Sequence, residues 1–292
     1  MPDTTPGSAS EVASPGYRAC VAMTTVAFDD DVRLAHVLAD SADSVSMDRF
    51  RALDLAVTIK QDSTPVTDAD RAVEDSIRST LARARPRDAV IGEELGSTGQ
   101  GPRRWVIDPI DGTKNYLRGV PVWATLIALM VEGEVVAGMV SAPALDRRWW
   151  AARGQGAWTG RSLAKARRCH VSDVQALDQA YLSYASLSGW EELGRLEEFF
   201  GLMRSCGRSR AFGDFWSYVL VAEGAVDIAC EPALALHDMA AVAVIVEEAG
   251  GRFTSVDGEP GPFGGNALAT NGHLHDATLG RLAPSRFPTA AR

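Results

Sequence analysis

The sequence has few cysteines, no excess of positive charge and no apolar run as long as a membrane span. Its cysteines are scattered, without a C-x-x-C pair, which argues against a disulfide framework or a zinc site and is typical of reduced cytoplasmic thiols. The formal net charge of −9 argues against a nucleic-acid or membrane surface, where basic patches are expected. We therefore expect a cytoplasmic protein without a nucleic-acid or membrane partner.

Both ends of the chain differ from its middle. Residues 1–28 are rich in Pro, Ser, Thr, Gly and Ala, and no positively charged start precedes an apolar segment there. We expect either a disordered tail or sequence upstream of a translation start at Met23. A flexible tail is expected at 284–292. The residues between, 29–283, are predicted to form a single domain of two packed αβ halves, 29–155 and 156–283.

Helical and strand-like patterns alternate along this domain. Helical periods predict helices from Asp29 and over about 67–83, 191–204, 215–224, 238–249 and 274–282. Apolar runs predict strands at 89–92, 105–108, 122–131, 135–142, 148–152, 180–184, 209–211, 226–229, 252–255 and 267–270. An α+β fold with mixed sheets layered by helices accommodates this order.

The most informative segment is Trp105–Asn115, which reads W-V-I-D-P-I-D-G-T-K-N. An apolar run ends in Asp108 and Asp111, and a Gly-Thr turn follows directly. Carboxylate oxygens bind hard divalent cations, and exposed backbone N–H groups bind phosphate oxygens, so the segment suits phosphate chemistry. Asp111 could instead cap a helix that begins at Thr113. Capping explains neither Asp108 nor the proline between the two aspartates.

Three other places supply acids at a strand end or a helix start. Glu93 and Glu94 follow a short strand, Asp70 lies in a first helical turn after Thr67, and Asp238 follows His237. Each has an ordinary alternative: a solvated loop, a capping box or a helix cap. His237 on its own is more often a packing residue than a ligand. Because the combined set contains carboxylates without several His or Cys partners, it favours Mg²⁺, with Mn²⁺ as the alternative.

At these residues the chain resembles the inositol monophosphatase-like family of Mg²⁺-dependent, lithium-sensitive phosphomonoesterases, from about Asp31 to Leu282. The family signature W-x-[IV]-D-P-[IL]-D-G-T-x-N is met in full, and its G-E-E element is met by residues 92–94. The later W-D element reads His237-Asp238 and ends at Gly250-Gly251, so the Trp is replaced by His. The resemblance implies the layered αβαβα sandwich that is shared with fructose-1,6-bisphosphatases.

The resemblance also implies roles for individual residues. The metal ligands would be Glu93, Asp108, Asp111, Asp238 and the carbonyl of Ile110, with Asp70 at the edge of the cluster. Thr113 and Glu93 would activate the attacking water, the Gly112 and Thr113 amides would bind the phosphate, and Lys60 would lie near the site. Two or three Mg²⁺ ions per site and a homodimer are expected.

Within the family, residues 118–123, 141–145, 147–154 and 186–190 look most like the actinobacterial histidinol-phosphate phosphatase branch. The expected reaction is hydrolysis of L-histidinol phosphate to L-histidinol and phosphate, in histidine biosynthesis, by direct attack of a metal-activated water. This substrate carries an ammonium and an imidazole, so its site should offer carboxylates and aromatic faces. Asp214, Glu231 and His237 are the candidate substrate-binding residues, although Asp214 could also be a helix cap.

Several alternatives remain open. Within the same family, the substrate could be inositol 1-phosphate or a range of sugar phosphates, and a 3′-phosphatase acting on phosphoadenosine phosphate comes third. Outside enzymes, the chain could be an inactive metal-binding regulatory homologue, or a structural subunit whose acids only cap helices.

Overall fold

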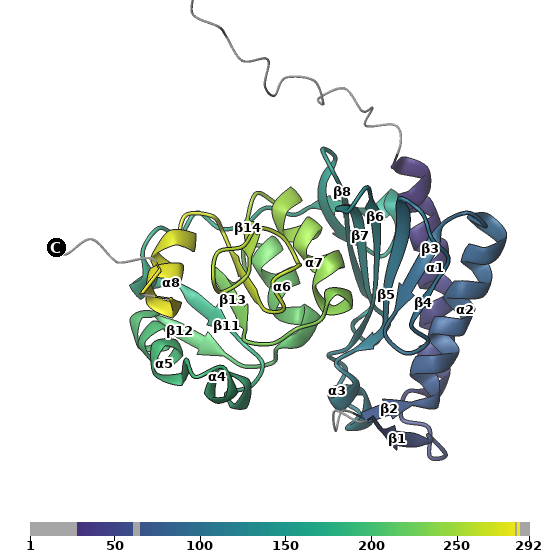
Figure 1. The fold of residues 1–292 in the computed structure, drawn as a ribbon, viewed down its shortest axis with the longest axis horizontal. Helices are drawn as coiled ribbons and strands as arrows, with labels where there is room; N and C mark the ends of the chain where they lie inside the picture. The colour runs from purple at the N-terminus through teal and green to yellow at the C-terminus, as the bar shows by residue number, and fades with distance from the viewer. Residues whose placement is uncertain (1–27, 61–64, 284, 287–292) are drawn as a thin grey trace, which may run out of the picture.

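The structure is a computed structural model that describes residues 28–60, 65–283 and 285–286 of the 292-residue chain. Of the two predicted tails, residues 1–27, 284 and 287–292 lie outside this description. Helices lie between and outside two main sheets (Figure 1). The predicted αβαβα sandwich with mixed sheets is confirmed.

The first sheet has eight strands in the order β10-β9-β8-β7-β6-β5-β3-β4. They are β3 (Ala89–Gly92), β4 (Ser97–Thr98), β5 (Arg103–Asp111), β6 (Ala124–Val131), β7 (Glu134–Ala142), β8 (Arg147–Ala152), β9 (Gly156–Gly160) and β10 (Arg167–Arg168). From β5 to β10 the strands form an antiparallel meander, whereas β3 runs parallel to β5. Strand β6 is buried over nearly its whole length, because helices cover both faces of the sheet.

Two pairs of helices cover this sheet. On the outer face lie α1 (Asp29–Arg49) and α2 (Asp68–Ala84), and on the inner face lie α6 (Asp214–Ala222) and α7 (Leu236–Glu248) (Figure 1). Acidic residues in the first turns of α1 and α2 complement the helix dipoles. Both outer helices bury one apolar stripe and leave the opposite side exposed.

The second sheet has five strands in the order β12-β11-β13-β15-β14, with β11 parallel to both of its neighbours. They are β11 (Tyr181–Ser183), β12 (Arg208–Arg210), β13 (Ile228–Glu231), β14 (Arg252–Thr254) and β15 (Ala267–Thr270). One face packs on α6 and α7. The other is covered by α4 (Ser188–Glu192), α5 (Leu196–Ser205) and α8 (His275–Leu282) (Figure 1).

Smaller elements complete the fold. A hairpin of β1 (Val57–Ile59) and β2 (Pro65–Thr67) precedes α2, and the short helix α3 (Thr113–Leu117) follows β5. Short 3₁₀ turns occur at Pro143–Leu145, Leu163–Lys165 and Leu177–Gln179.

Helix α7 occupies the centre of the molecule, between the two sheets. All residues from Met239 to Val246 are buried, as expected for a helix that is apolar around its whole circumference. Its contact with β7 requires a glycine, because a Cβ on Gly138 would lie only 2.6 Å from the carbonyl oxygen of Ala241. The helix that carries Asp238 is therefore held from both sides.

The structure corrects some of the predicted elements. The helix predicted at 191–204 is two helices, because the chain turns at Gly194, where φ is 71°. The strand predicted at 226–229 lies at Ile228–Glu231. Strands β1, β2, β4, β9 and β10 were not predicted, and the first sheet extends to Arg168. The division of the chain into halves at 155/156 stays a prediction.

Within the described ranges, no helix is both long and apolar enough to cross a bilayer.

A buried histidine ties α8 to the second sheet. His275 is fully buried, and its two ring nitrogens lie 2.9 Å from Thr254 Oγ1 and 3.0 Å from Thr270 Oγ1. Burial, reinforced by the positive charge of Arg252, lowers the pKa of His275 from 6.5 to about 4. The ring is therefore neutral in the folded protein at neutral pH.

This shift predicts acid sensitivity. The unfolded chain binds a proton at His275 near pH 6.5 but the folded chain does so only near pH 4, so its contribution to stability is lost as the pH falls between these values. We expect urea unfolding to show a smaller loss of stability from pH 7 to pH 5 in His275→Gln than in the unsubstituted protein. Equal losses in both proteins would contradict this.

Candidate active site

A β-bulge at the end of β5 brings the two aspartates of the signature together. Residues three apart on a regular strand point to opposite faces of a sheet. Between Asp108, opposite Leu126, and Asp111, opposite Ala124, the strand carries one extra residue. The Thr125 hydroxyl donates to the freed carbonyl of Pro109 at 2.8 Å. Both carboxylates can therefore face one site.

Gly112 makes the turn from β5 into α3. Its φ of 82° lies in the left-handed region, and a Cβ there would come within 3.0 Å of the Val122 carbonyl oxygen. The hydroxyl of the next residue, Thr113, donates to the carbonyl of Ile110 at 2.9 Å. The predicted phosphate-binding residues thus directly adjoin the bulge.

The third acid of the cluster comes from the second half of the chain. Asp238, in the first turn of α7, accepts the Ala235 N–H through Oδ2 at 2.7 Å. Ligand oxygens of Asp108, Asp111 and Asp238 all lie within 4.8 Å of one another. Oδ2 of Asp111 also accepts the Phe215 N–H at 2.6 Å, which links β5 to the start of α6.

The electrostatics of this carboxylate cluster are unfavourable without a cation. Burial raises the pKa of Asp108 and Asp111 well above the usual range, and neighbouring carboxylates raise both further: Glu93, Asp111 and Asp238 act on Asp108, and Asp214 and Asp238 act on Asp111. Among the described residues, the buried Oδ1 of Asp108 has no hydrogen-bond partner. An all-oxygen set with an unpartnered buried carboxylate oxygen fits a hard divalent cation such as Mg²⁺.

Asp70 lies at the edge of this site and also caps its own helix. Its Oδ2 accepts the backbone N–H of Thr67 at 2.8 Å and the Thr67 hydroxyl at 2.5 Å, so the capping box considered as an alternative is present. Its Oδ1 lies 3.4 Å from Thr113 Oγ1. The carboxylate thus has one oxygen committed to the cap and one directed to the signature turn.

Glu93 lies in the turn after β3 and pairs with Lys60. The Lys60 ammonium is 2.7 Å from Glu93 Oε1 and also contacts Glu94. Burial opposes the charge of Lys60, but the bonds to these two glutamates outweigh it and raise its pKa. The structure therefore places Lys60 at the site, where it partly neutralises the acid that faces Asp108.

The candidate substrate-binding residues lie beside the carboxylate cluster. Burial and the charge of Asp238 raise the pKa of Asp214 to about 6, and burial with Asp214 and Asp238 raises that of Glu231 to about 8. Glu231 Oε1 is buried and has no partner within the described part of the chain. His237 Nε2 lies 3.6 Å from Asp238 Oδ1.

Asp214 has an unusual backbone. Its φ of 51° lies in the left-handed region and follows Gly213 at 66°, a conformation that Asp tolerates better than most residues. Its Oδ2 accepts from Asn115 Nδ2 at 3.2 Å, whereas the Phe215 N–H at the start of α6 donates to Asp111.

Sequence reasoning gave no role to two residues that organise the site. Asn115 bridges Val122 and Asp214, and Glu74 on α2 holds the turn that carries Glu93. Asn115 could have been found, since it belongs to the signature. In the sequence, Glu74 looks like an ordinary exposed acid on a helix. The structure shows instead that it is fully buried.

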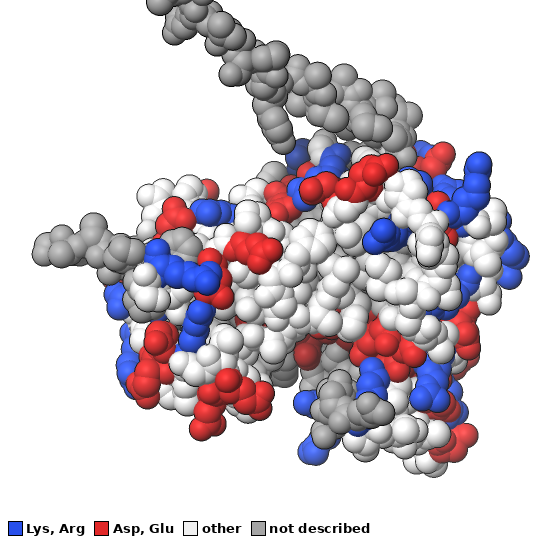
Figure 2. All heavy atoms as spheres, viewed as in Figure 1, with Lys and Arg blue, Asp and Glu red and all other residues white. Residues whose placement is uncertain are grey.

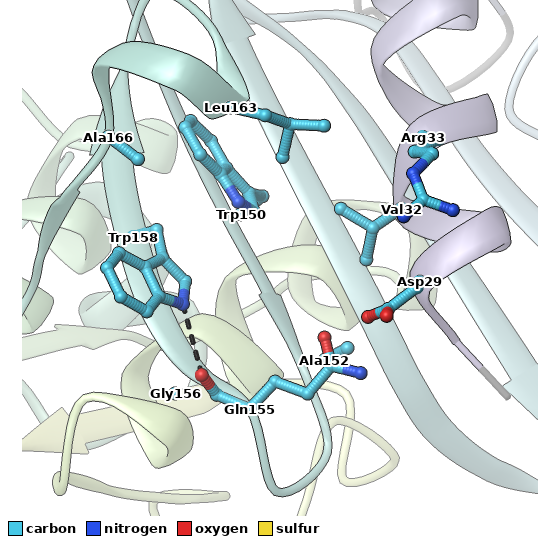
Figure 3. Close-up of a pocket in the computed structure, with 10 residues that line it drawn as sticks. All are labelled: Asp29, Val32, Arg33, Trp150, Ala152, Gln155, Gly156, Trp158, Leu163 and Ala166. Atoms are coloured by element: carbon cyan, nitrogen blue, oxygen red, sulfur yellow. Dashed lines mark hydrogen bonds between the residues drawn. The ribbon is translucent and has the colours of Figure 1, made fainter. Parts of the chain in front are cut away.

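A separate cavity of about 270 Å³ lies between α1 and strands β8 and β9 (Figure 3). The indoles of Trp150 and Trp158 line it, and the Trp158 ring donates to the Gln155 carbonyl at 3.0 Å. None of the predicted site residues lines this cavity, and it lacks a carboxylate cluster. We therefore do not place phosphate chemistry there.

Comparison with known proteins agrees with this geometry. The sequence profile of the inositol monophosphatase family matches residues 30–286, and the chain belongs to that family. It is 64% identical over 257 residues to a histidinol-phosphatase of Streptomyces coelicolor, with 87% of this chain and 97% of the relative covered. It is 58% identical over 254 residues to a histidinol-phosphatase of Mycobacterium tuberculosis, with 87% and 98% covered. The resemblance stated from the sequence is confirmed.

Solved structures show the same fold. The extragenic suppressor protein suhB of Bartonella henselae superposes with a TM-score of 0.81 at 30% identity, covering 87% of this chain and 99% of that one. An inositol monophosphatase of Zymomonas mobilis superposes with a TM-score of 0.77 at 33% identity, covering 88% and 98%.

The carboxylate cluster predicts opposite effects of one substitution with and without metal. Asp108→Asn removes a charge from a buried group of like charges. We therefore expect the metal-free melting temperature to rise by a few degrees, which corresponds to roughly 1 kcal/mol in the free energy of unfolding. The rise that Mg²⁺ causes in the unsubstituted protein should be lost, because ligand binding stabilises only while the site binds. Differential scanning fluorimetry with and without Mg²⁺ measures both effects.

Asp276→Asn is a matched control, because this aspartate side chain is 86% exposed and pairs only with Arg252 among the described residues. Neither melting temperature should change. An equal Mg²⁺-dependent rise in Asp108→Asn and the unsubstituted protein would show that Asp108 does not hold the ion.

Proposed function

We propose that this chain is a Mg²⁺-dependent phosphomonoesterase that hydrolyses L-histidinol phosphate to L-histidinol and phosphate. The observation that carries the phosphatase assignment is the convergence of Asp108, Asp111 and Asp238 beside the Gly112–Thr113 turn. The substrate assignment is supported by two histidinol-phosphatases at 64% and 58% identity that the chain covers almost completely.

In this proposal the metal ligands are Glu93, Asp108, Asp111, Asp238 and the carbonyl of Ile110. We expect two or three Mg²⁺ ions, with Mn²⁺ as a substitute. Bound Mg²⁺ supplies positive charge that lowers the pKa of water and stabilises the leaving oxygen. Such charge is needed because phosphate monoester hydrolysis requires an acceleration of up to about 10²¹, whereas one general base supplies about 10²–10⁴.

The protein groups orient the reaction. Thr113, whose hydroxyl lies between the Ile110 carbonyl and Asp70, accepts a hydrogen bond from the attacking water and positions it, and the Glu93 carboxylate accepts the proton that the water releases. The Gly112 and Thr113 amides bind the phosphate oxygens. The Thr113 hydroxyl has one proton to donate: where the Ile110 carbonyl holds a metal ion, the hydroxyl would donate to Asp70 Oδ1 instead and direct its lone pairs at the water.

Three side chains recognise the leaving group in this proposal. Asp214 and Glu231 offer carboxylates to the ammonium and imidazole of histidinol phosphate, and His237 lies next to them. Burial and neighbouring carboxylates raise the pKa of the Asp214 and Glu231 carboxyl groups, and a cationic substrate beside them would favour their charged forms. A neutral polyol such as inositol would favour those charged forms less.

The protein is further proposed to be a cytoplasmic homodimer whose partner is a small phosphate monoester. Figure 2 shows acidic and basic side chains interspersed over one described face, which supports the expectation that nucleic acid is not a partner.

A substrate panel tests the function directly. With Mg²⁺, phosphate release from L-histidinol phosphate should exceed release from inositol 1-phosphate, a sugar phosphate and phosphoadenosine phosphate by at least about tenfold in kcat/KM, which corresponds to about 1.4 kcal/mol. A higher kcat/KM on inositol 1-phosphate would transfer the assignment to that substrate. Metal binding without release from any ester would indicate the inactive regulatory homologue.

The role of Asp214 is tested by Asp214→Asn, which tolerates the positive φ but removes the charge. We expect kcat/KM for histidinol phosphate to fall about 10- to 100-fold, the size of a charge-assisted hydrogen bond of about 1.5–3 kcal/mol. Release from a small neutral phosphate ester should change little. Equal losses on both esters would remove the proposed role in recognition.

A further inference from the structure

The turn that carries Glu93 is fastened to two neighbouring elements. On one side, the Glu93 N–H donates to the Ile107 carbonyl on β5 at 3.2 Å, directly before Asp108. On the other side, the N–H groups of Glu94 and Leu95 donate to the Glu74 carboxylate on α2 at 2.8 and 3.2 Å. The backbone around Glu93 is thus fixed between the strand of Asp108 and the helix of Asp70.

Glu74 is suited to this task by its place on α2. It follows Asp70 by four residues, so the two acids share one face of the helix, and both are fully buried. Asp70 reaches toward Thr113, while Glu74 accepts two backbone N–H groups from the turn. One helix face therefore contacts two parts of the candidate site.

The Glu74 carboxylate is itself held by Arg78. The guanidinium lies 2.7 Å from Glu74 Oε1, and it also donates to Thr98 Oγ1 at 2.9 Å and to the Gly96 carbonyl. It thus bonds to both the helix acid and the far side of the same turn. A buried carboxylate requires such partners, because an unpaired one would be strongly destabilising.

Gly92 shows how closely the carboxylate approaches the turn. A Cβ at this position would lie 1.9 Å from Glu74 Oε1, so only glycine leaves room for the carboxylate. The first residue of the G-E-E element therefore accommodates Glu74.

We propose that Glu74, held by Arg78, is a positioning residue that sets the place of Glu93 relative to Asp108 and Asp70 and thereby sets the affinity for Mg²⁺. This inference rests on the proposed function, in which Glu93 is a metal ligand. Groups that orient a metal ligand typically change metal affinity or activity about 10- to 100-fold when removed.

Glu74→Gln is the direct test. Glutamine has one acceptor oxygen in place of two, and its NH₂ group would face two backbone donors and a guanidinium, so the turn should loosen. We expect the Mg²⁺ concentration for half-maximal activity to rise about 10- to 100-fold, with kcat at saturating Mg²⁺ changed less. Mn²⁺ binding followed by electron paramagnetic resonance should weaken in parallel, which does not depend on turnover.

Asp31→Asn is the matched control, because it makes the same chemical change in another buried acid paired with arginine. The Asp31 side chain is 4% exposed and lies 2.7 Å from Arg103 and 3.3 Å from Arg85, but it contacts none of the predicted site residues. The metal-free melting temperature of the Asp31→Asn variant should fall, while its Mg²⁺ requirement stays unchanged. If Glu74 had a purely structural role, Glu74→Gln would likewise lower the melting temperature and leave the Mg²⁺ requirement unchanged.

If Glu74→Gln does not fold, Arg78→Lys tests the positioning role of Glu74 instead. Lysine keeps a cation beside Glu74 but cannot bond to Glu74, Gly96 and Thr98 at once, so a smaller rise in the Mg²⁺ requirement is expected. An unchanged Mg²⁺ requirement and unchanged Mn²⁺ affinity in a folded variant would overturn the proposal. Failure of the unsubstituted protein to release phosphate would instead contradict the proposed function, and Mn²⁺ binding would still report on Glu74.

Discussion

Mutual repulsion among buried carboxylates is the constraint on which this structure depends. Two acids from β5 and one from α7 converge within 4.8 Å, and three more, Glu93, Asp214 and Glu231, lie close enough to raise the pKa of Asp108 or Asp111. In a medium of low polarity such a group is unfavourable unless protons or cations compensate it. The rest of the fold must therefore be stable enough to hold the acids in place, and that stability comes from the buried layers on either side.

The acids meet because the two sheets share one pair of central helices. Strand β5 supplies Asp108 and Asp111 through its bulge, and α7 supplies Asp238. The bond from the Phe215 N–H to Asp111 joins the end of β5 to the start of α6, where the candidate substrate acid Asp214 begins its helix. In the proposed function, the metal ligand Asp111 and the substrate-recognising Asp214 are thus linked through one backbone hydrogen bond.

Much of the fold and of the site could be predicted from local patterns, because both depend on residues close in sequence. The long apolar runs of β6 and β7 and the capping residues of α2 can each be recognised from a short stretch of neighbouring residues. The signature also predicted that Asp108 and Asp111 face one site, and their carboxylates lie close together in the structure. Strands β1, β2, β4, β9 and β10 were missed. Of these, β1 is exposed throughout, and β4 and β10 have only two residues each. The contacts of Lys60 and Glu74 depend on which elements pack together, and no local pattern contains that information.

The burial of α7 on all sides has a consequence for how related proteins can diverge. One inserted residue would rotate everything beyond it by about 100° and present the wrong side chains to both sheets. The segment from Tyr184 to Gly213, which leads to Asp214, runs largely along the outside of the second sheet and contains exposed positions such as Leu187 and Phe212. Relatives with different substrates should therefore keep the length of α7 and differ in the length of that outer segment, so that new specificities arise without disturbing the buried carboxylate cluster.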